Sequence, residues 1–239
     1  AGRNRTGVNT MKTDTEADVR TDTAIRVAAI FFVAIMFLAF TTDPIRTGTK
    51  EGDRAPPLTG MAYNGSGWTN FDMSDYIDTN WTAGDTDGQW LLVDFVDTDC
   101  PICLRDAEKV GQNAEYFMKF VMDPDNPDEP AWKGPVVNFV ASATELNIDG
   151  HDTSRMEIVA FRDKSGGETC NGNSCAARGG SAHGFVYIDD IDQDNLKAWK
   201  VPGTPSYYLI QPDGIVAWVS SENPNEEISD AIFRLTLGA

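Results

Sequence analysis

Two cysteines separated by two residues, in Cys100-Pro101-Ile102-Cys103, have the types and spacing that could carry out thiol chemistry. They follow Leu91–Val96, an apolar run typical of a strand buried on both faces. After them, apolar residues recur every three or four positions as far as Val121, which predicts a helix. Cys100 is therefore expected at the helix start with Pro101 at N1, where unpaired backbone N–H groups and the helix dipole favour a thiolate. This strand–Cys-x-x-Cys–helix arrangement predicts a redox pair rather than a zinc site.

A second segment, Val201–Ile210, lies far along the chain and contains Thr204-Pro205 ahead of a strand pattern. Together with Val93-Asp94-Phe95 before the cysteines, it makes the sequence resemble the thioredoxin superfamily, in which a cis-proline, here Pro205, faces the active cysteines. The resemblance covers Gly52 to the C-terminus. It implies an α/β, thioredoxin-like fold, with a central mixed sheet flanked by helices. It also implies a thiol–disulfide oxidoreductase that needs no bound organic cofactor.

The resemblance also implies roles for single residues. Cys100 would attack a substrate disulfide, and Cys103 would resolve the mixed disulfide. Asp94 has the position of the family's buried acid. A carboxylate in an apolar strand should have a raised pKa through desolvation and could take the proton of Cys103. The alternative for Asp94 is an exposed carboxylate at a strand end.

The substrate groove would be shaped by Pro101, Thr204 and Pro205. In this interpretation the backbone of Thr204 pairs with an extended segment of the substrate, a form of strand addition. The alternative is an ordinary trans proline in a loop. Asp99 stands where family members usually carry a tryptophan, and the dipeptide Pro101-Ile102 helps to set the reduction potential in this family. Whether the protein acts as oxidant or reductant is left open by these departures.

Cys170 and Cys175 form a second cysteine pair, in a glycine-rich loop outside the family core. A structural disulfide is one interpretation and agrees with an oxidising compartment. A second redox pair that relays electrons to the first is another, and a four-cysteine metal site is the third. His151 and His183 are too few and too scattered for a metal cage and are interpreted as loop histidines, so we predict no metal site.

Three further segments carry structural signals. Met61–Tyr63 and Trp68–Phe71 flank Asn64-Gly65-Ser66-Gly67, which predicts a hairpin. A hairpin at this place favours the membrane-tethered members of the superfamily that resemble TlpA and ResA. The Pro- and Asp-rich segment Asp123–Pro130 is expected to end the active-site helix. Near the C-terminus, Asn223-Pro224-Asn225-Glu226 predicts a helix start with Asn223 as its cap.

The N-terminal part of the sequence predicts a membrane anchor. We expect a disordered cytoplasmic tail over 1–23, a single transmembrane helix over 24–42, a polar linker over 43–55 and the thioredoxin-like domain over 56–239. A cleaved signal peptide and a buried soluble helix are the alternatives, and the lack of a small-x-small cleavage site favours the anchor. Five Lys/Arg residues precede the apolar run Val27–Phe40 and three follow it before residue 56. This bias predicts a catalytic domain on the extracytoplasmic side.

The net charge of −18 is far from ordinary for 239 residues. Such a surface repels nucleic acid, so a DNA- or RNA-binding function is excluded. The expected partners are protein disulfide or dithiol substrates and a membrane or soluble redox protein that resets the cysteine pair. Two other functions stay open: copper or zinc handling by Cys100 and Cys103, and a peroxidase of related fold. Asp94, Pro205 and the lack of a histidine near the motif argue against metal handling.

Overall fold

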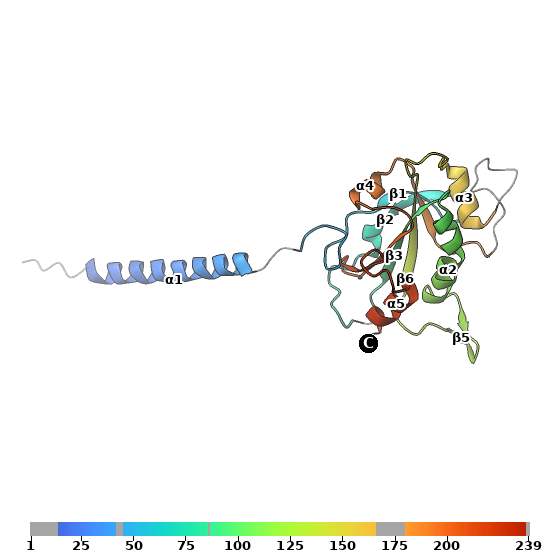
Figure 1. Cartoon of the computed structure of the whole chain (residues 1–239). Helices are drawn as coiled ribbons and strands as arrows, with labels where there is room; N and C mark the ends of the chain where they lie inside the picture. The colour runs from blue at the N-terminus through green and yellow to red at the C-terminus, as the bar shows by residue number, and fades with distance from the viewer. Residues whose placement is uncertain (1–13, 42–44, 86, 166–179, 238–239) are drawn as a thin grey trace, which may run out of the picture. The chain divides into compact units, whose positions relative to one another are not determined.

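The computed structural model describes residues 14–41, 45–85, 87–165 and 180–237. The chain divides into two units, Ala1–Pro44 and Ile45–Ala239. In the first unit, helix α1 (Asp14–Thr41) begins inside the range 1–23 predicted as a disordered tail, so residues 14–23 are helical instead (Figure 1).

Within the described part of the chain, no helix is both long enough and apolar enough to cross a membrane. The transmembrane anchor over 24–42 stays a prediction.

The second unit is built on a mixed sheet of seven strands in the order β2-β1-β7-β6-β3-β8-β9. The strands are β1 (Thr59–Tyr63), β2 (Trp68–Asp72), β3 (Trp90–Asp97), β6 (Val137–Thr144), β7 (Val186–Asp190), β8 (Ser206–Ile210) and β9 (Val216–Val219). Strands β3, β6 and β7 are parallel to one another, and the other neighbours pair antiparallel. The predicted hairpin is β1–β2, and it joins the sheet through β7. This is the mixed α/β architecture that the sequence predicted.

Helices cover both faces of this sheet. The structure has α2 (Pro101–Phe117), α3 (Arg155–Asp163), α4 (Asp194–Ala198), α5 (Ile228–Thr236) and the 3₁₀ turn η1 (Met73–Tyr76). Buried residues of α2, α3 and α5 pack with Leu92 and Val96 in one core cluster. Leu91, Val93 and Phe95 point to the other face and pack in a second cluster with Met73 and Trp199. Because β3 contributes to both clusters, it lies at the centre of the unit, as Figure 1 shows.

The predicted linker 43–55 is part of the folded unit from Ile45 onward, so this domain boundary is wrong. Gly52 N–H donates to Val216 O at 2.9 Å and Ala55 N–H donates to Gly214 O at 3.0 Å. Ala55 is buried. A polar composition suggested a free tether, but these residues satisfy backbone groups beside β9.

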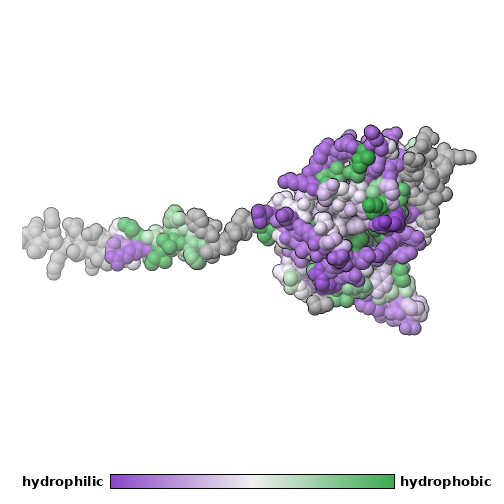
Figure 2. Space-filling view, in the orientation of Figure 1, coloured by the Kyte–Doolittle hydropathy of each residue, from purple (hydrophilic) through white to green (hydrophobic). Residues whose placement is uncertain are grey.

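Two element boundaries also differ from the sequence prediction. Helix α5 begins at Ile228, after the cap residue Glu227, and not at Pro224. The side chain of Asn223 donates instead to Val219 O at 3.1 Å, closing the turn after β9. The Pro- and Asp-rich segment forms a small hairpin, β4 (Met122–Asp123) and β5 (Asn126–Pro130), after α2 ends. Figure 2 shows that the visible face of the larger unit is mostly hydrophilic with small hydrophobic patches, as its acidic composition predicts.

Candidate active site

Cys100 is the N-cap residue of α2, and Pro101 is the first residue of that helix. The Cys100 Sγ atom accepts a hydrogen bond from the backbone N–H of Cys103 at 3.4 Å. Its thiol donates to the carbonyl oxygen of Thr204, also at 3.4 Å. The peptide bond from Thr204 to Pro205 is cis. The structure thus brings together the two segments that the sequence singled out, and it places Cys100 at the helix start as predicted.

Both cysteines are free thiols, with Cys100 6% exposed and Cys103 3% exposed. Burial raises the pKa of the Cys103 thiol well above its ordinary value, and the nearby charge of Asp94 adds to this effect. Between the two cysteines, Ile102 is 47% exposed. An apolar side chain therefore lies at the surface beside a sparingly exposed sulfur, while Cys103 is more deeply buried.

Asp94 lies in the middle of β3, on the face covered by α2, and is 4% exposed. Burial, with a smaller contribution from the charge of Asp106, raises the pKa of Asp94 to about 8. Its Oδ1 atom is buried and has no hydrogen-bond partner among the described residues. The alternative of an exposed strand-end carboxylate is wrong. A buried carboxyl with this pKa can give or take a proton near neutral pH.

A buried carboxylate, Asp97, fixes the loop between β3 and α2. Its Oδ1 accepts from the backbone N–H of Asp99 at 2.8 Å, and its Oδ2 accepts from Leu146 N–H at 2.8 Å and contacts His151 Nδ1 at 2.7 Å. The carbonyl oxygen of Asp97 accepts the N–H of Cys100 at 3.1 Å. Asp97 thus links the backbone of Cys100 to the loop that follows β6.

Sequence reasoning missed this role for Asp97 and His151. His151 does lie in a loop, as predicted, but its ring is engaged by a fully buried acid. No motif with a fixed spacing links Asp97 to His151, because the two residues lie far apart in the chain. The sequence carries one signal for this role: Asp97 is a second acidic residue, after Asp94, at the end of a strand predicted to be buried. An unpaired charge is costly there, so a partner for Asp97 is expected.

Asp99, in the position before Cys100, joins the same two loops. Its Oδ2 accepts from Asp152 N–H at 3.0 Å. Thr98 and Thr153 share a hydrogen bond of 3.0 Å between their hydroxyl groups. Asp99 is therefore tied to the protein backbone and supplies no apolar surface next to Cys100, in contrast to the tryptophan of the family pattern.

His183 is a structural residue of the core. Its Nδ1 lies 2.6 Å from the hydroxyl of Tyr187, and its ring stacks on Phe185. Burial lowers the pKa of His183 to about 3, so the ring is neutral under ordinary conditions.

Cys170 and Cys175 lie outside the described residues, and the three interpretations of that pair stay open. In the part that the structure covers, no three His, Cys, Asp or Glu side chains are grouped so as to hold a metal ion.

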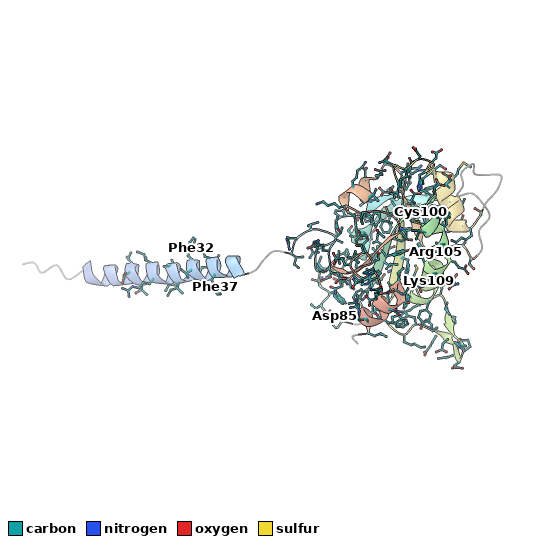
Figure 3. The ribbon with its side chains drawn as sticks, in the orientation of Figure 1. Phe32, Phe37, Asp85, Cys100, Arg105 and Lys109 are labelled. Carbon is teal, nitrogen blue, oxygen red and sulfur yellow. The ribbon has the colours of Figure 1, made fainter. Side chains whose placement is uncertain are left out.

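A pocket of about 260 Å³ opens beside the first turns of α2. Arg105 and Lys109 line it from α2, below Cys100 in Figure 3. The opposite wall comes from β8, β9 and the segment before α5, with Tyr207, Trp218 and Glu226. The residues that line the pocket carry charges of both signs, so the pocket favours water and polar groups over apolar ones.

No protein-family model and no curated protein matches the sequence. Solved structures that resemble the chain include a thioredoxin domain of a thiol-disulfide oxidoreductase from Bacteroides vulgatus, at 17% identity over 76% of this chain and 92% of that chain, with a TM-score of 0.42. A secreted disulfide oxidoreductase from Mycobacterium tuberculosis is 19% identical over 66% of this chain and 79% of its own, with a TM-score of 0.38. The reduced 2-Cys peroxiredoxin of Plasmodium vivax is 14% identical over 72% and 71%, with a TM-score of 0.45. With TM-scores below 0.5, these similarities do not indicate an activity for this chain.

Proposed function

We propose that this protein is a thiol–disulfide oxidoreductase that exchanges disulfides with protein substrates through Cys100 and Cys103. One observation carries the proposal: the Cys100 sulfur sits at the N-terminus of α2, bonded to the N–H of Cys103 and to Thr204 O. Backbone N–H groups at a helix start stabilise a thiolate, which is the form that attacks a disulfide. A second thiol one helical turn further on is the group needed to release the product.

When a substrate disulfide is reduced, the exchange needs two displacements. The Cys100 thiolate attacks one substrate sulfur, the substrate disulfide breaks, and one substrate sulfur leaves as a thiolate. The Cys103 thiol then gives its proton to Asp94 while its sulfur attacks Cys100 Sγ. This forms the Cys100–Cys103 disulfide and releases the second substrate thiolate. Two electrons pass to the substrate, and the same steps in reverse oxidise a substrate dithiol.

Substrate binding is proposed at the surface formed by Pro101, Thr204 and Pro205. In the free protein the carbonyl oxygen of Thr204 accepts from the Cys100 thiol. When Cys100 is a thiolate it no longer donates, so that carbonyl becomes free to accept from the backbone of an extended substrate segment. Exposed Ile102 supplies apolar contact beside it.

The test uses two serine variants and a disulfide-bonded protein substrate. We expect Cys100→Ser to abolish exchange, and Cys103→Ser to attack the substrate but remain joined to it as a mixed disulfide. Metal content of the reduced protein and peroxide consumption are measured in parallel. Stoichiometric copper or zinc with no disulfide exchange would replace the proposal with metal handling. Peroxide consumption that survives Cys103→Ser would replace it with a peroxidase.

We also propose that the catalytic unit works on the extracytoplasmic side of a membrane and is reset there by a second redox protein. The charge-free run Val27–Phe40 and the excess of Lys/Arg before it support this location. The described apolar side chains of α1, including Phe32 and Phe37, are exposed and lie along the helix labelled in Figure 3. Alkaline carbonate extraction of membranes and protease accessibility test the location. Recovery of the full chain in the soluble fraction would contradict it.

A further inference from the structure

The buried acid of the proposed site needs a route to water. Asp94 must accept a proton in each cycle and then lose it, yet it is 4% exposed and its Oδ1 has no partner in the described part of the chain. The titratable groups that interact with it are Cys103 and Asp106 from α2 and Tyr207 from β8; its neighbour on β6 is Ala141, which cannot titrate.

Among these groups, Tyr207 lies between Asp94 and the pocket beside α2. Asp94 and Tyr207 are direct partners in the antiparallel register of β3 and β8. Directly opposite residues point to the same face of the sheet, with Cβ atoms roughly 4.5–5.5 Å apart. Burial raises the pKa of Tyr207 above its ordinary value, and the charges of Asp94, Cys103 and Asp106 raise it further. Its hydroxyl is therefore electrically coupled to both proton-exchanging groups of the site.

The other side of Tyr207 faces solvent-accessible space. Tyr207 and Asp106 both line the pocket of about 260 Å³, with Arg105 and Lys109 at its α2 wall and Glu226 and Glu227 opposite. A polar cavity of this size holds several water molecules. Asp94 is not among the residues that line it. Tyr207 is thus shared between the surroundings of the buried acid and the pocket.

We propose that Tyr207 and the water of this pocket form the path by which Asp94 exchanges its proton with solvent. The inference rests on the proposed function and makes Tyr207 a positioning residue that acts through Asp94. After Cys103 has given its proton to Asp94, the carboxylic acid passes a proton to the Tyr207 oxygen while the Tyr207 O–H proton moves to a pocket water. Tyr207 ends unchanged, Asp94 is again a carboxylate, and the proton is in solvent. The reverse sequence delivers a proton when a dithiol substrate is oxidised.

The neighbouring tyrosine provides a matched control. Tyr208 is the next residue on β8 and packs on the opposite face of the sheet, in the cluster of Phe95 and Trp199. Tyr207→Phe and Tyr208→Phe each remove one hydroxyl from the same strand. Near neutral pH Asp94 mostly carries a proton, which it must lose before it can take the proton of Cys103. The measurement is therefore the rate at which the mixed disulfide at Cys100 is resolved by Cys103, across pH, in H₂O and D₂O, with and without imidazole as a small proton carrier.

We expect Tyr207→Phe to resolve the mixed disulfide on the order of tenfold more slowly near neutral pH, with a larger solvent isotope effect. Imidazole should restore much of this rate, and Tyr208→Phe should behave as the wild-type protein does. In an Asp94→Asn background, Tyr207→Phe should add no further loss, because the relay acts through Asp94. Equal rates, isotope effects and imidazole responses in the two tyrosine variants would overturn the relay.

This result is separable from the proposed function. Loss of exchange in Cys100→Ser together with equal behaviour of the two tyrosine variants would leave the oxidoreductase standing and remove the relay. Absence of exchange in the wild-type protein would remove both.

Discussion

The ring of His151 lies against the buried carboxylate of Asp97, with 2.7 Å between Nδ1 and Oδ2. Asp97 is fully buried and also accepts two backbone N–H groups, from Asp99 and Leu146. Since its own carbonyl receives the N–H of Cys100, this acid holds the backbone of the proposed nucleophile. The loop that follows β6 is thereby part of the active-site frame.

Asp97→Asn should destabilise the protein and loosen the Cys100 loop. An amide keeps one acceptor oxygen but turns an NH₂ group toward backbone N–H donors, and hydrogen bonds to a charged group are worth about 1.5–3 kcal/mol. We expect the free energy of unfolding in urea to fall by about that amount and Cys100 to react faster with an alkylating reagent. Asp149→Asn, an exposed change on the same loop, is the control. Equal unfolding free energies in the two variants would contradict the role of Asp97.

Asp94→Asn should slow the resolving step without preventing the first attack by Cys100. The amide cannot take the proton of Cys103, and general base catalysis contributes on the order of 10²-fold or more. In the wild-type protein, resolution should speed up as pH rises through about 8, because the carboxylate form of Asp94 then becomes the major one. The variant should lack this rise and accumulate mixed disulfide, measured by quenched single-turnover reactions. A pH profile that is the same in both proteins would exclude Asp94 as the base.

The same substitution should stabilise the reduced protein, by an amount that depends on pH. The folded-state pKa of Asp94 is about 8 and its ordinary value is 3.8. The native state therefore retains a proton that the unfolded chain releases, and stability falls as pH rises between these two values. Asp94→Asn removes this cost. Its gain in unfolding free energy should be small near pH 4, grow with pH and level off above about 8, as measured in urea. A gain that is constant across this range would show that Asp94 is not the buried acid described.

The sequence was most informative where local signals and the family motif coincide. The run Leu91–Val96 and the proline after Cys100 predicted β3 and the start of α2, because a buried strand and a helix start each leave a pattern in neighbouring positions. The end of α2 was predicted less well, because the apolar periodicity continues to Val121 whereas the helix ends at Phe117. The same local reasoning failed at Asn223-Pro224. There the asparagine closes a turn after β9, and tertiary contacts decide between a turn and a helix cap.

Contacts between distant segments were much harder to predict. The meeting of Cys100 and Thr204 was expected only through the resemblance to a known family, since nothing in the spacing of the two segments requires it. The pairing of Asp97 with His151 has no motif at all. Tyr207 likewise becomes informative only when the register of β3 and β8 sets it opposite Asp94. Register and loop packing are properties of the folded chain, and a single sequence states them only indirectly.

Gly111 sets how closely α2 approaches the core at His183, and Gly111→Ala tests this packing. A Cβ atom at Gly111 would lie 2.9 Å from Cδ2 and 3.0 Å from Nε2 of that ring. The ring cannot easily move, because it is bonded to Tyr187 and stacked on Phe185. Alanine gains about 1 kcal/mol of helix propensity over glycine, while overpacking costs about 1–3 kcal/mol.

We therefore expect Gly111→Ala to lower the free energy of unfolding by up to about 2 kcal/mol, although alanine usually stabilises a helix relative to glycine. Gln112→Ala, an exposed change one residue further along α2, is the control and should be neutral or slightly stabilising. Adding His183→Ala should make the Gly111 substitution favourable, because the clash is then removed. If Gly111→Ala stabilises the otherwise unchanged protein, α2 has room to move outward, and the close contact with His183 does not set the position of this helix.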